Sequence, residues 1–144
     1  MSACLLDVNV LVAMSWPEHS SHTTALKWMA RHGREGWATC PFTQAGFVRI
    51  ISNPAFSRDA LEPQQALSLL RANLQHPAHQ FWPDALGVYE ALSRVRPITG
   101  HNQTTDAYLL ALALSRRGRL VTLDRSLAGL LPAGVRGDSV IVLS

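Results

Sequence analysis

The chain is poor in several residue types and motifs that mark particular classes of protein. It has two cysteines, Cys4 and Cys40, which are too few for a disulfide framework, and their apolar neighbours predict buried free thiols. Lys27 is the only lysine among thirteen basic residues. No apolar run approaches the roughly eighteen residues of a membrane span. The chain also lacks a P-loop, a G-x-G-x-x-G motif and a Cys-x-x-Cys pair, which argues against nucleotide-cofactor and dithiol redox proteins.

These absences leave a single cytoplasmic domain, residues 1–144, as the expectation. The length matches one domain, and 47% apolar residues are enough for a core. The amino terminus lacks the basic start and small-residue cleavage site of a signal peptide. The formal net charge is +3, and almost all of the basic residues are arginine. This charge permits nucleic-acid binding without demonstrating it.

Strand-like and helix-like segments alternate along the chain. We expect strands at 5–13, 37–43, 79–84, 119–124 and 139–144, and helices at 19–32, 44–52, 62–74, 85–95, 105–118 and 126–131. Thr43, Asp84 and Thr105 are the expected N-caps of three of these helices. The alternation predicts an α/β fold with a mostly parallel five-stranded sheet, covered by helices on both faces.

Polar residues interrupt or end the apolar strands of this predicted sheet. Asp7 and Asn9 stand two residues apart in "LLDVNVLVA", so in a strand both side chains would emerge on one face. A carboxylate removed from water is costly unless something pairs with it. Asp124 ends the strand at 119–124, and Asp106 begins the helix before that strand. If the two strands are neighbours, all three carboxylates meet at the carboxyl edge of the sheet, where ligands bind in such folds.

Three adjacent carboxylates predict a metal site. Asp7, Asp106 and Asp124 would repel one another and partly protonate unless a cation joined them, and oxygen ligands select Mg²⁺ or Mn²⁺. Asn9 would orient a ligand or a metal-bound water. The sequence also leaves ordinary explanations open, because Asp is common in the first turn of a helix and as a cap.

At these residues the chain resembles PIN-domain proteins, in particular VapC toxins of the VapBC toxin–antitoxin type. The resemblance rests on "LLDVNVLVA", "PFTQAGFVRI", "TTDAYLLALALSRRG" and "LVTLDRSL", in this order over most of the chain. It implies a PIN-like three-layer sandwich and Mg²⁺- or Mn²⁺-dependent cleavage of RNA that leaves 5′-phosphate and 3′-hydroxyl ends. It also implies a VapB-like antitoxin as partner and a homodimer, for which the apolar helices of residues 43–74 would supply a face.

The resemblance assigns roles to individual positions. Asp7, Asp106 and Asp124 match the family acids and become the expected catalytic and metal-binding residues. The expected supporting residues are Asn9, Thr105 and Thr122. Because the expected catalyst is a metal bound by side chains, no organic cofactor is expected.

Gln44 departs from the family pattern, which commonly has Glu in this segment. Its carbonyl oxygen is a weak metal ligand without a charge, so we expect weaker cation binding, above all at a second metal position. Two outcomes follow: an enzyme that depends on one strong metal site, or an inactive PIN fold that only binds RNA or an antitoxin.

Other chemistries find less support in the sequence. The histidine pairs of "HSSH" (residues 19–22) and "HPAH" (residues 76–79) lack further ligands for zinc, so surface histidines are expected. A haloacid-dehalogenase-like phosphatase would need a second Asp at the position of Asn9. A receiver domain would need a late lysine at a strand end, and Lys27 stands far too early.

Overall fold

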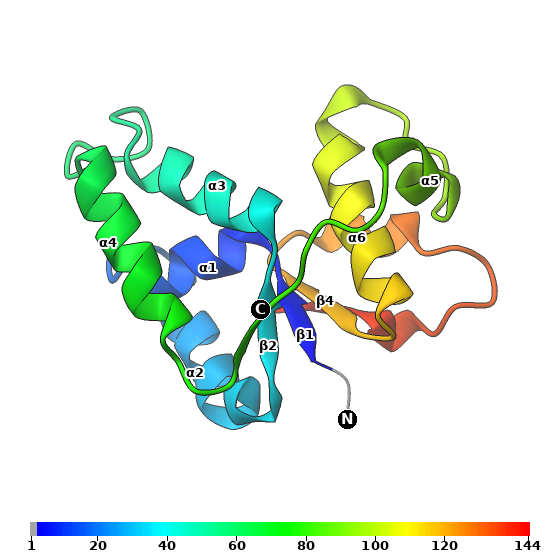
Figure 1. Ribbon diagram of the computed structural model, residues 1–144, viewed down its shortest axis with the longest axis horizontal. Coiled ribbons are helices and arrows are strands. Elements are labelled where there is room, and N and C mark those ends of the chain that lie inside the picture. Colours follow the sequence, from blue (N-terminus) through cyan, green and yellow to red (C-terminus); the bar gives the residue numbers. More distant parts are fainter. Residues whose placement is uncertain (1–2) are drawn as a thin grey trace.

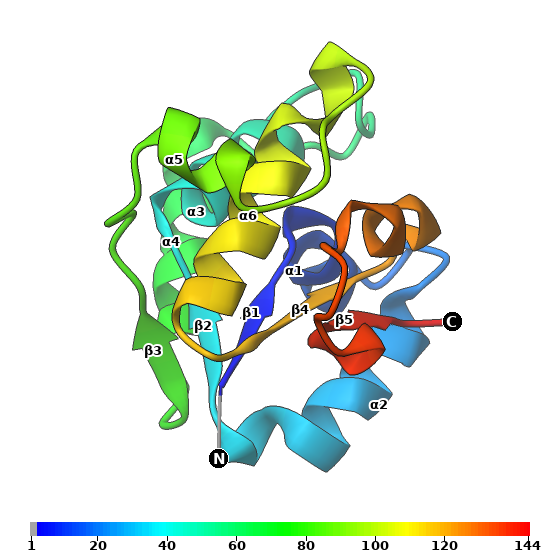
Figure 2. The same ribbon diagram turned by 90° about the vertical axis from the view of Figure 1, so that its right-hand side faces the viewer.

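The computed structural model describes residues 3–144, which form one five-stranded sheet with helices on both faces (Figure 1). The strands are β1 (Cys4–Leu6), β2 (Trp37–Thr39), β3 (His79–Phe81), β4 (Arg119–Thr122) and β5 (Val140–Val142). Their order is β3-β2-β1-β4-β5, and all four neighbouring pairs run parallel. In Figure 2, β3 and β5 lie at the two edges of the sheet. The predicted parallel sheet is confirmed.

Six α-helices connect and cover the strands. They are α1 (Val8–Ser15), α2 (His22–His32), α3 (Pro41–Ile51), α4 (Pro63–Leu74), α5 (Val88–Ser93) and α6 (Thr104–Ser115). Short 3₁₀ helices occupy Gly33–Glu35, His101–Gln103, Arg125–Leu130 and Gly137–Ser139. None of these helices has the length and apolar character that crossing a bilayer requires.

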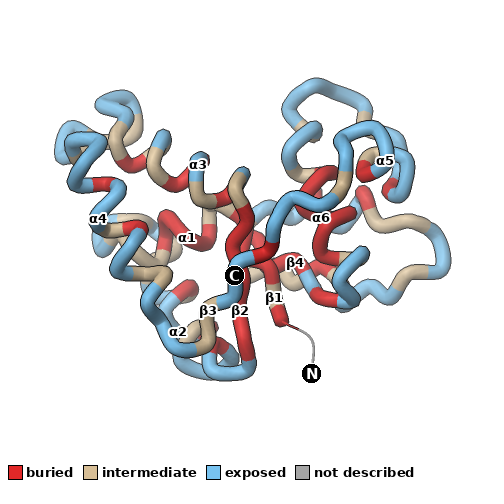
Figure 3. The backbone as a smooth tube through the Cα atoms, in the orientation of Figure 1, coloured by how far each residue is buried: buried red, intermediate tan, exposed pale blue. Residues whose placement is uncertain are grey.

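Neighbouring residues of the central strands face two different cores. Leu5 and Leu120 pack with α5 and α6, whereas Leu6 and Val121 pack with α1 to α4. This alternation follows from the two-residue period of a strand. The buried strands between the two helical layers are visible in Figure 3. The three-layer arrangement predicted from the sequence is therefore confirmed.

The segment predicted as a strand at 5–13 is mostly helix. β1 ends at Leu6, and Asp7 is the N-cap of α1, where its side chain accepts a hydrogen bond from the Val8 amide. Asn9 consequently lies in the first turn of a helix and not on a strand face. A run of Val and Leu fits a buried helix as well as a buried strand, and here the capping side chain of Asp7 ends the strand.

The predicted cap at Thr43 is wrong for a local reason. Pro41 occupies the first position of α3, which its fixed backbone angle suits, and Cys40 becomes the N-cap. Thr43 is the third residue of the helix, and its Oγ1 accepts a 2.9 Å hydrogen bond from the Cys40 amide. Thr43 therefore stabilises the same helix terminus from inside the helix.

Two other predicted caps are also displaced. α5 begins at Val88 with Gly87 as its N-cap, so Asp84 lies outside the helix. α6 begins at Thr104, which places Thr105 in its first turn, exposed to solvent.

Both cysteines are free, as predicted. Cys40 is buried and Cys4 is half-buried. Burial raises the pKa of the Cys4 thiol, which favours its protonated form.

A close contact between α1 and α3 brings the starts of both helices to the carboxyl edge of the sheet. A Cβ atom on Gly46 of α3 would lie 2.8 Å from Cγ2 of Val8, so only glycine permits this spacing. Val8 directly follows Asp7, and the contact therefore fixes the position of the first predicted site residue.

Candidate functional site

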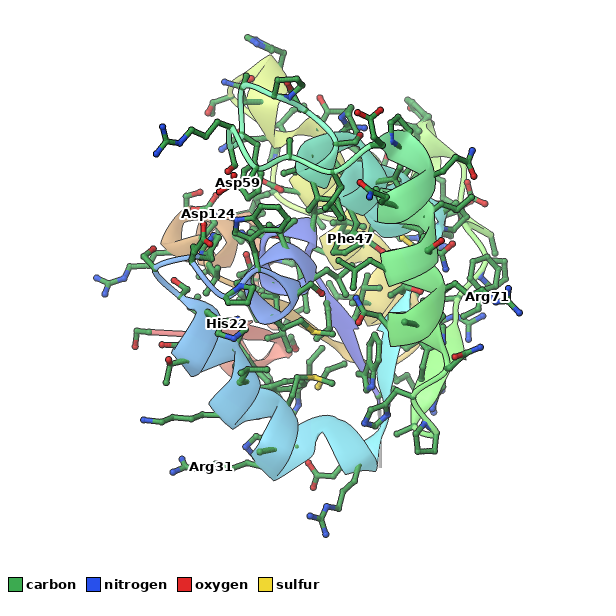
Figure 4. All side chains as sticks on the ribbon, turned by 90° about the vertical axis from the view of Figure 1, so that its left-hand side faces the viewer. His22, Arg31, Phe47, Asp59, Arg71 and Asp124 are labelled. Carbon is green, nitrogen blue, oxygen red and sulfur yellow. The ribbon has the colours of Figure 1, made fainter. Side chains whose placement is uncertain are left out.

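A pocket of about 290 Å³ lies at the carboxyl ends of β1 and β4. Its walls are formed by Asp7, Val8, Asn9, Val12, His19, Ile50, Phe56, Asp106 and Asp124. The three predicted acids come from the end of β1, the first turn of α6 and the loop after β4, and all of them line this pocket. Figure 4 shows Asp124 on the same side of the molecule as His22, around α1. The fold thus brings the three carboxylates together as the sequence predicted.

Asp7 is the most buried of the three acids, with 6% of its surface exposed. The Val8 amide donates to its Oδ1 at 2.7 Å, and the Thr122 hydroxyl donates to its Oδ2 at 2.7 Å. Burial raises the pKa of Asp7, the two hydrogen bonds lower it, and the negative charge of Asp124 raises it further. The net direction is upward, so the ionised form is held at a cost that a cation would reduce.

Thr122 and Asn9 connect α1 to the loop that follows β4. The Asn9 side-chain amide donates to Thr122 Oγ1 at 3.3 Å, and the Leu123 backbone amide donates to Asn9 Oδ1 at 3.2 Å. The Asp124 backbone amide donates to the same threonine oxygen at 3.0 Å. Through these bonds Asn9 and Thr122, two of the three predicted supporting residues, fix Asp124 relative to Asp7.

Asp124 is both a helix cap and part of the lining of the pocket. It is the N-cap of the 3₁₀ helix Arg125–Leu130, where its Oδ1 accepts from the Ser126 amide at 2.9 Å and from the Ser126 hydroxyl at 2.7 Å. The same carboxylate lines the pocket. Capping orients the side chain and leaves its second oxygen for another partner.

Asp106 is half-buried in the first turn of α6. Burial raises its pKa to about 6, and the charges of Asp7 and Asp124 contribute in the same direction. No hydrogen bond within residues 3–144 offsets these effects. The three carboxylates therefore lie close enough to act on one another electrostatically.

The donor chemistry of the pocket fits a hard divalent cation. Carboxylate oxygens are the ligands that Mg²⁺ and Mn²⁺ prefer, and a cation would reverse the upward pKa shifts of Asp7 and Asp106. As the side chains stand, no three His, Cys, Asp or Glu residues in the described part of the chain converge as a finished ligand set. Asp7 and Asp124 instead accept hydrogen bonds from their own chain neighbours.

Three predicted site residues do not line the pocket, namely the buried Thr122 described above, Gln44 and Thr105. The Gln44 side-chain amide donates to Thr39 Oγ1 at 2.9 Å, and Thr39 also forms a 2.8 Å hydrogen bond with His79 Nε2. Burial lowers the pKa of His79, which favours its neutral ring. Thr105 is exposed on the outer side of the first turn of α6. The proposed metal-binding role of Gln44 and the supporting role of Thr105 stay predictions.

One pocket residue is not recognisable as a site residue from the sequence. The sequence predicts a surface histidine at position 19, yet His19 is only half-exposed and lines the pocket with the acids. Nothing in "HSSH" distinguishes it from His22, whose Nδ1 instead bonds the Ala13 carbonyl at 2.7 Å. Only the turn between α1 and α2 decides which of the two histidines reaches the pocket.

The fold and its acid-lined pocket agree with a family match over most of the chain. The model of the PIN domain family matches residues 4–130. Among solved structures, Mycobacterium tuberculosis VapC20, described as a sarcin-ricin loop cleaving toxin, superposes with a TM-score of 0.67. The match covers 93% of this chain and 99% of that one at 13% identity. VapBC2 from Rickettsia felis, bound to a DNA fragment from its promoter, gives a TM-score of 0.62 at 15% identity, covering 97% and 96%. The chain belongs to the PIN-domain family.

Close relatives narrow this assignment to the VapC proteins. Ribonuclease VapC39 of Mycobacterium tuberculosis is 41% identical over 132 residues, which is 91% of this chain and 95% of the relative. Ribonuclease VapC38 of the same organism is 42% identical over 120 residues, covering 83% and 84%.

Proposed function

We propose that this VapC protein is a metal-dependent endoribonuclease and the toxin of a toxin–antitoxin pair. The observation that carries the proposal is the meeting of Asp7, Asp106 and Asp124, from three separate segments, in one pocket. The ribonuclease names of relatives more than 40% identical support the activity. A phosphodiester is the substrate whose hydrolysis such a carboxylate site serves best.

Asp7 and Asp106 are the proposed direct ligands of Mg²⁺ or Mn²⁺, Asp124 binds directly or through water, and Gln44 is the weakest candidate. When bound, the ion supplies an acidified water and neutralises charge on the phosphate. Attack by water on phosphorus breaks the bond to the 3′-oxygen, which takes up a proton. The products then carry 5′-phosphate and 3′-hydroxyl ends.

The chain's own residues prepare the site for this chemistry. Thr122 holds Oδ2 of Asp7 in a single orientation, and Asn9 holds the loop that carries Asp124. Asp106 must lose its proton before it can bind a cation, and a pKa of about 6 allows this at neutral pH. Gln44 contributes no charge, so the site binds its metal more weakly than one with a fourth carboxylate.

The proposed partners are RNA, a VapB-like antitoxin and a second copy of the chain. The Rickettsia felis neighbour is a VapBC pair, which supports the antitoxin. Leu67 on α4 is 51% exposed and lies within residues 43–74, the face expected for the homodimer.

The test is cleavage of RNA by the purified chain without antitoxin, in millimolar Mg²⁺ or Mn²⁺ and in chelator. We expect cleavage with either metal and none in chelator or in the Asp7→Asn variant. Gln44 favours a second candidate, a PIN fold that binds RNA or an antitoxin without cutting. Binding of RNA with no cleavage at any metal concentration would select that candidate.

A further inference from the structure

Part of the lining of the pocket is not acidic. It includes His19, from the segment between α1 and α2, and Phe56, from the segment after α3, with the aliphatic side chains of Val12 and Ile50. The metal chemistry proposed above uses only the acids, so these residues are left without a role. Together they offer one imidazole ring among apolar side chains.

The hydrogen bonding of His19 fixes which of its ring nitrogens carries the proton. Nδ1 accepts a 2.9 Å hydrogen bond from the Ser21 backbone amide, which requires a lone pair on that atom. The neutral ring therefore carries its hydrogen on Nε2. Nε2–H is the donor that remains for a ligand, and His19 is the one basic side chain among the pocket residues of the described chain.

Two contacts hold Phe56 in place. Its ring packs at 66° against the ring of Trp16, with centroids 5.3 Å apart, and its backbone amide donates to the Asn53 carbonyl at 2.9 Å. A half-buried aromatic ring beside a phosphodiester-cleaving site offers an apolar surface for a nucleobase, because unpaired RNA bases pack on such rings.

We propose that His19 and Phe56 form a nucleotide subsite next to the acids, an inference that rests on the proposed ribonuclease function. Nε2–H of His19 binds a phosphate oxygen of the RNA, and Phe56 packs against the base of the same nucleotide. The pocket volume of about 290 Å³ is at the small end for ligand sites, which suits one nucleotide. A phosphate entering beside three carboxylates meets repulsion, and the His19 donor offsets part of it.

The test compares variants that remove the donor while keeping the local turn. In His19→Asn, the short amide side chain keeps an acceptor for the Ser21 amide, as Asn53 does for Ala55, but cannot reach as far as Nε2. We expect KM for cleavage of a randomised-sequence RNA pool to rise about tenfold with kcat little changed, as on loss of a hydrogen bond to a charged group. His32→Ala, which removes an exposed histidine on α2 outside this pocket, should match the wild type.

Phe56→Leu tests the other half of the subsite. The variant keeps an apolar wall but loses the ring, so we expect the preference for particular bases at the cleaved position to flatten while cleavage continues. An unchanged pattern of cleavage sites would remove the base contact from the proposal.

A binding measurement separates failure of the subsite from failure of the proposed function. In the Asp7→Asn variant, titration with the same RNA pool should shift the NMR signals of the His19 imidazole and leave those of His32 in place. If the wild type cuts RNA while the His19→Asn kinetics and the His19 signals stay unchanged, the subsite is wrong and the ribonuclease stands. If the wild type neither binds nor cuts RNA, the proposed function itself fails.

Discussion

The hydroxyl of Thr122 donates a 2.7 Å hydrogen bond to Oδ2 of Asp7 and joins segments that lie 115 residues apart in the chain. Thr122 is fully buried, and its oxygen also accepts from Asn9 and from the Asp124 amide. One side chain thus sets the relative position of two of the three acids.

Replacing Thr122 with Val keeps the side-chain volume and removes these hydrogen bonds. We expect the free energy of unfolding to fall by about 1–3 kcal/mol, because buried groups lose their partners. Metal affinity should fall about tenfold, because Asp7 loses its orientation. Urea unfolding and calorimetric titration with Mn²⁺ measure the two effects. Thr23→Val, at an exposed threonine of α2 outside the pocket, is the matched control, and equal losses in both variants would contradict the role of Thr122.

Asp7→Asn removes the charge of the most buried acid. Cleavage of RNA should drop at least about a hundredfold, because the proposed metal site loses one of its charged ligands. Burial raises the pKa of Asp7, so its ionised form destabilises the metal-free fold and the variant should unfold at no lower temperature than the wild type. Cleavage rates and thermal melting in chelator test this pair of outcomes. Full activity of the variant would place the catalytic centre elsewhere.

Asp106 should make the metal-free fold less stable as the pH rises. Its pKa is 3.8 in an unperturbed chain and about 6 in the folded protein, so the folded state binds the proton more tightly. The contribution of this proton to the free energy of unfolding is therefore complete below pH 3.8 and is lost as the pH rises through about 6.

The Asp106→Asn variant lacks this titration, which makes it the comparison for the wild type. In chelator, the free energy of unfolding of the variant relative to that of the wild type should increase by about 1 kcal/mol between about pH 5 and about pH 7.5. This value is reduced to allow for screening at the half-exposed position. Urea unfolding across this range measures it. A difference that does not change with pH would show that Asp106 is not perturbed.

Gln44→Glu restores the charge that the family pattern carries at this position. We expect tighter binding of Mg²⁺ and a faster cleavage rate, since a further negative group near the acids favours the cation. In the wild type the Gln44 amide donates to the Thr39 hydroxyl. A glutamate cannot donate, so the Thr39 hydroxyl would donate to its carboxylate instead. Calorimetry and single-turnover cleavage measure the change, with Gln65→Glu on α4 as a control for added charge. Unchanged metal affinity would show that residue 44 lies outside the metal site.

Gly46→Ala tests the close contact between α1 and α3. The new Cβ would meet Cγ2 of Val8 at 2.8 Å, and the branched Val8 side chain has little freedom to turn away. We expect a loss of about 1–3 kcal/mol in the free energy of unfolding, as for other overpacked cores. Gly129→Ala, where no atom lies within 4 Å of the added carbon, should leave stability nearly unchanged. Chemical unfolding of both variants measures the two changes in the free energy of unfolding.

Much of the fold follows from local features of the sequence. Alternating apolar segments predicted the parallel sheet with helices on both faces, because each segment carries its own hydrophobic period. Asp7 directly follows β1 and Asp124 lies two residues after β4, so their meeting at one sheet edge needed only that β1 and β4 be neighbours. The start of α1 was missed, since Val-rich and Leu-rich residues fit a buried helix and a buried strand equally well.

The sequence by itself determined the kind of fold and the three acids of its pocket, because strand ends and hydrophobic periods are properties of short segments. Only the tertiary structure decided that His19 reaches the pocket, that Gln44 bonds Thr39, and that Thr122 joins Asp7 to Asp124. Each of these contacts depends on how separate elements pack and on where a turn directs the chain. Such packing depends on side chains from all parts of the core together, so it cannot be predicted from a short segment of the sequence.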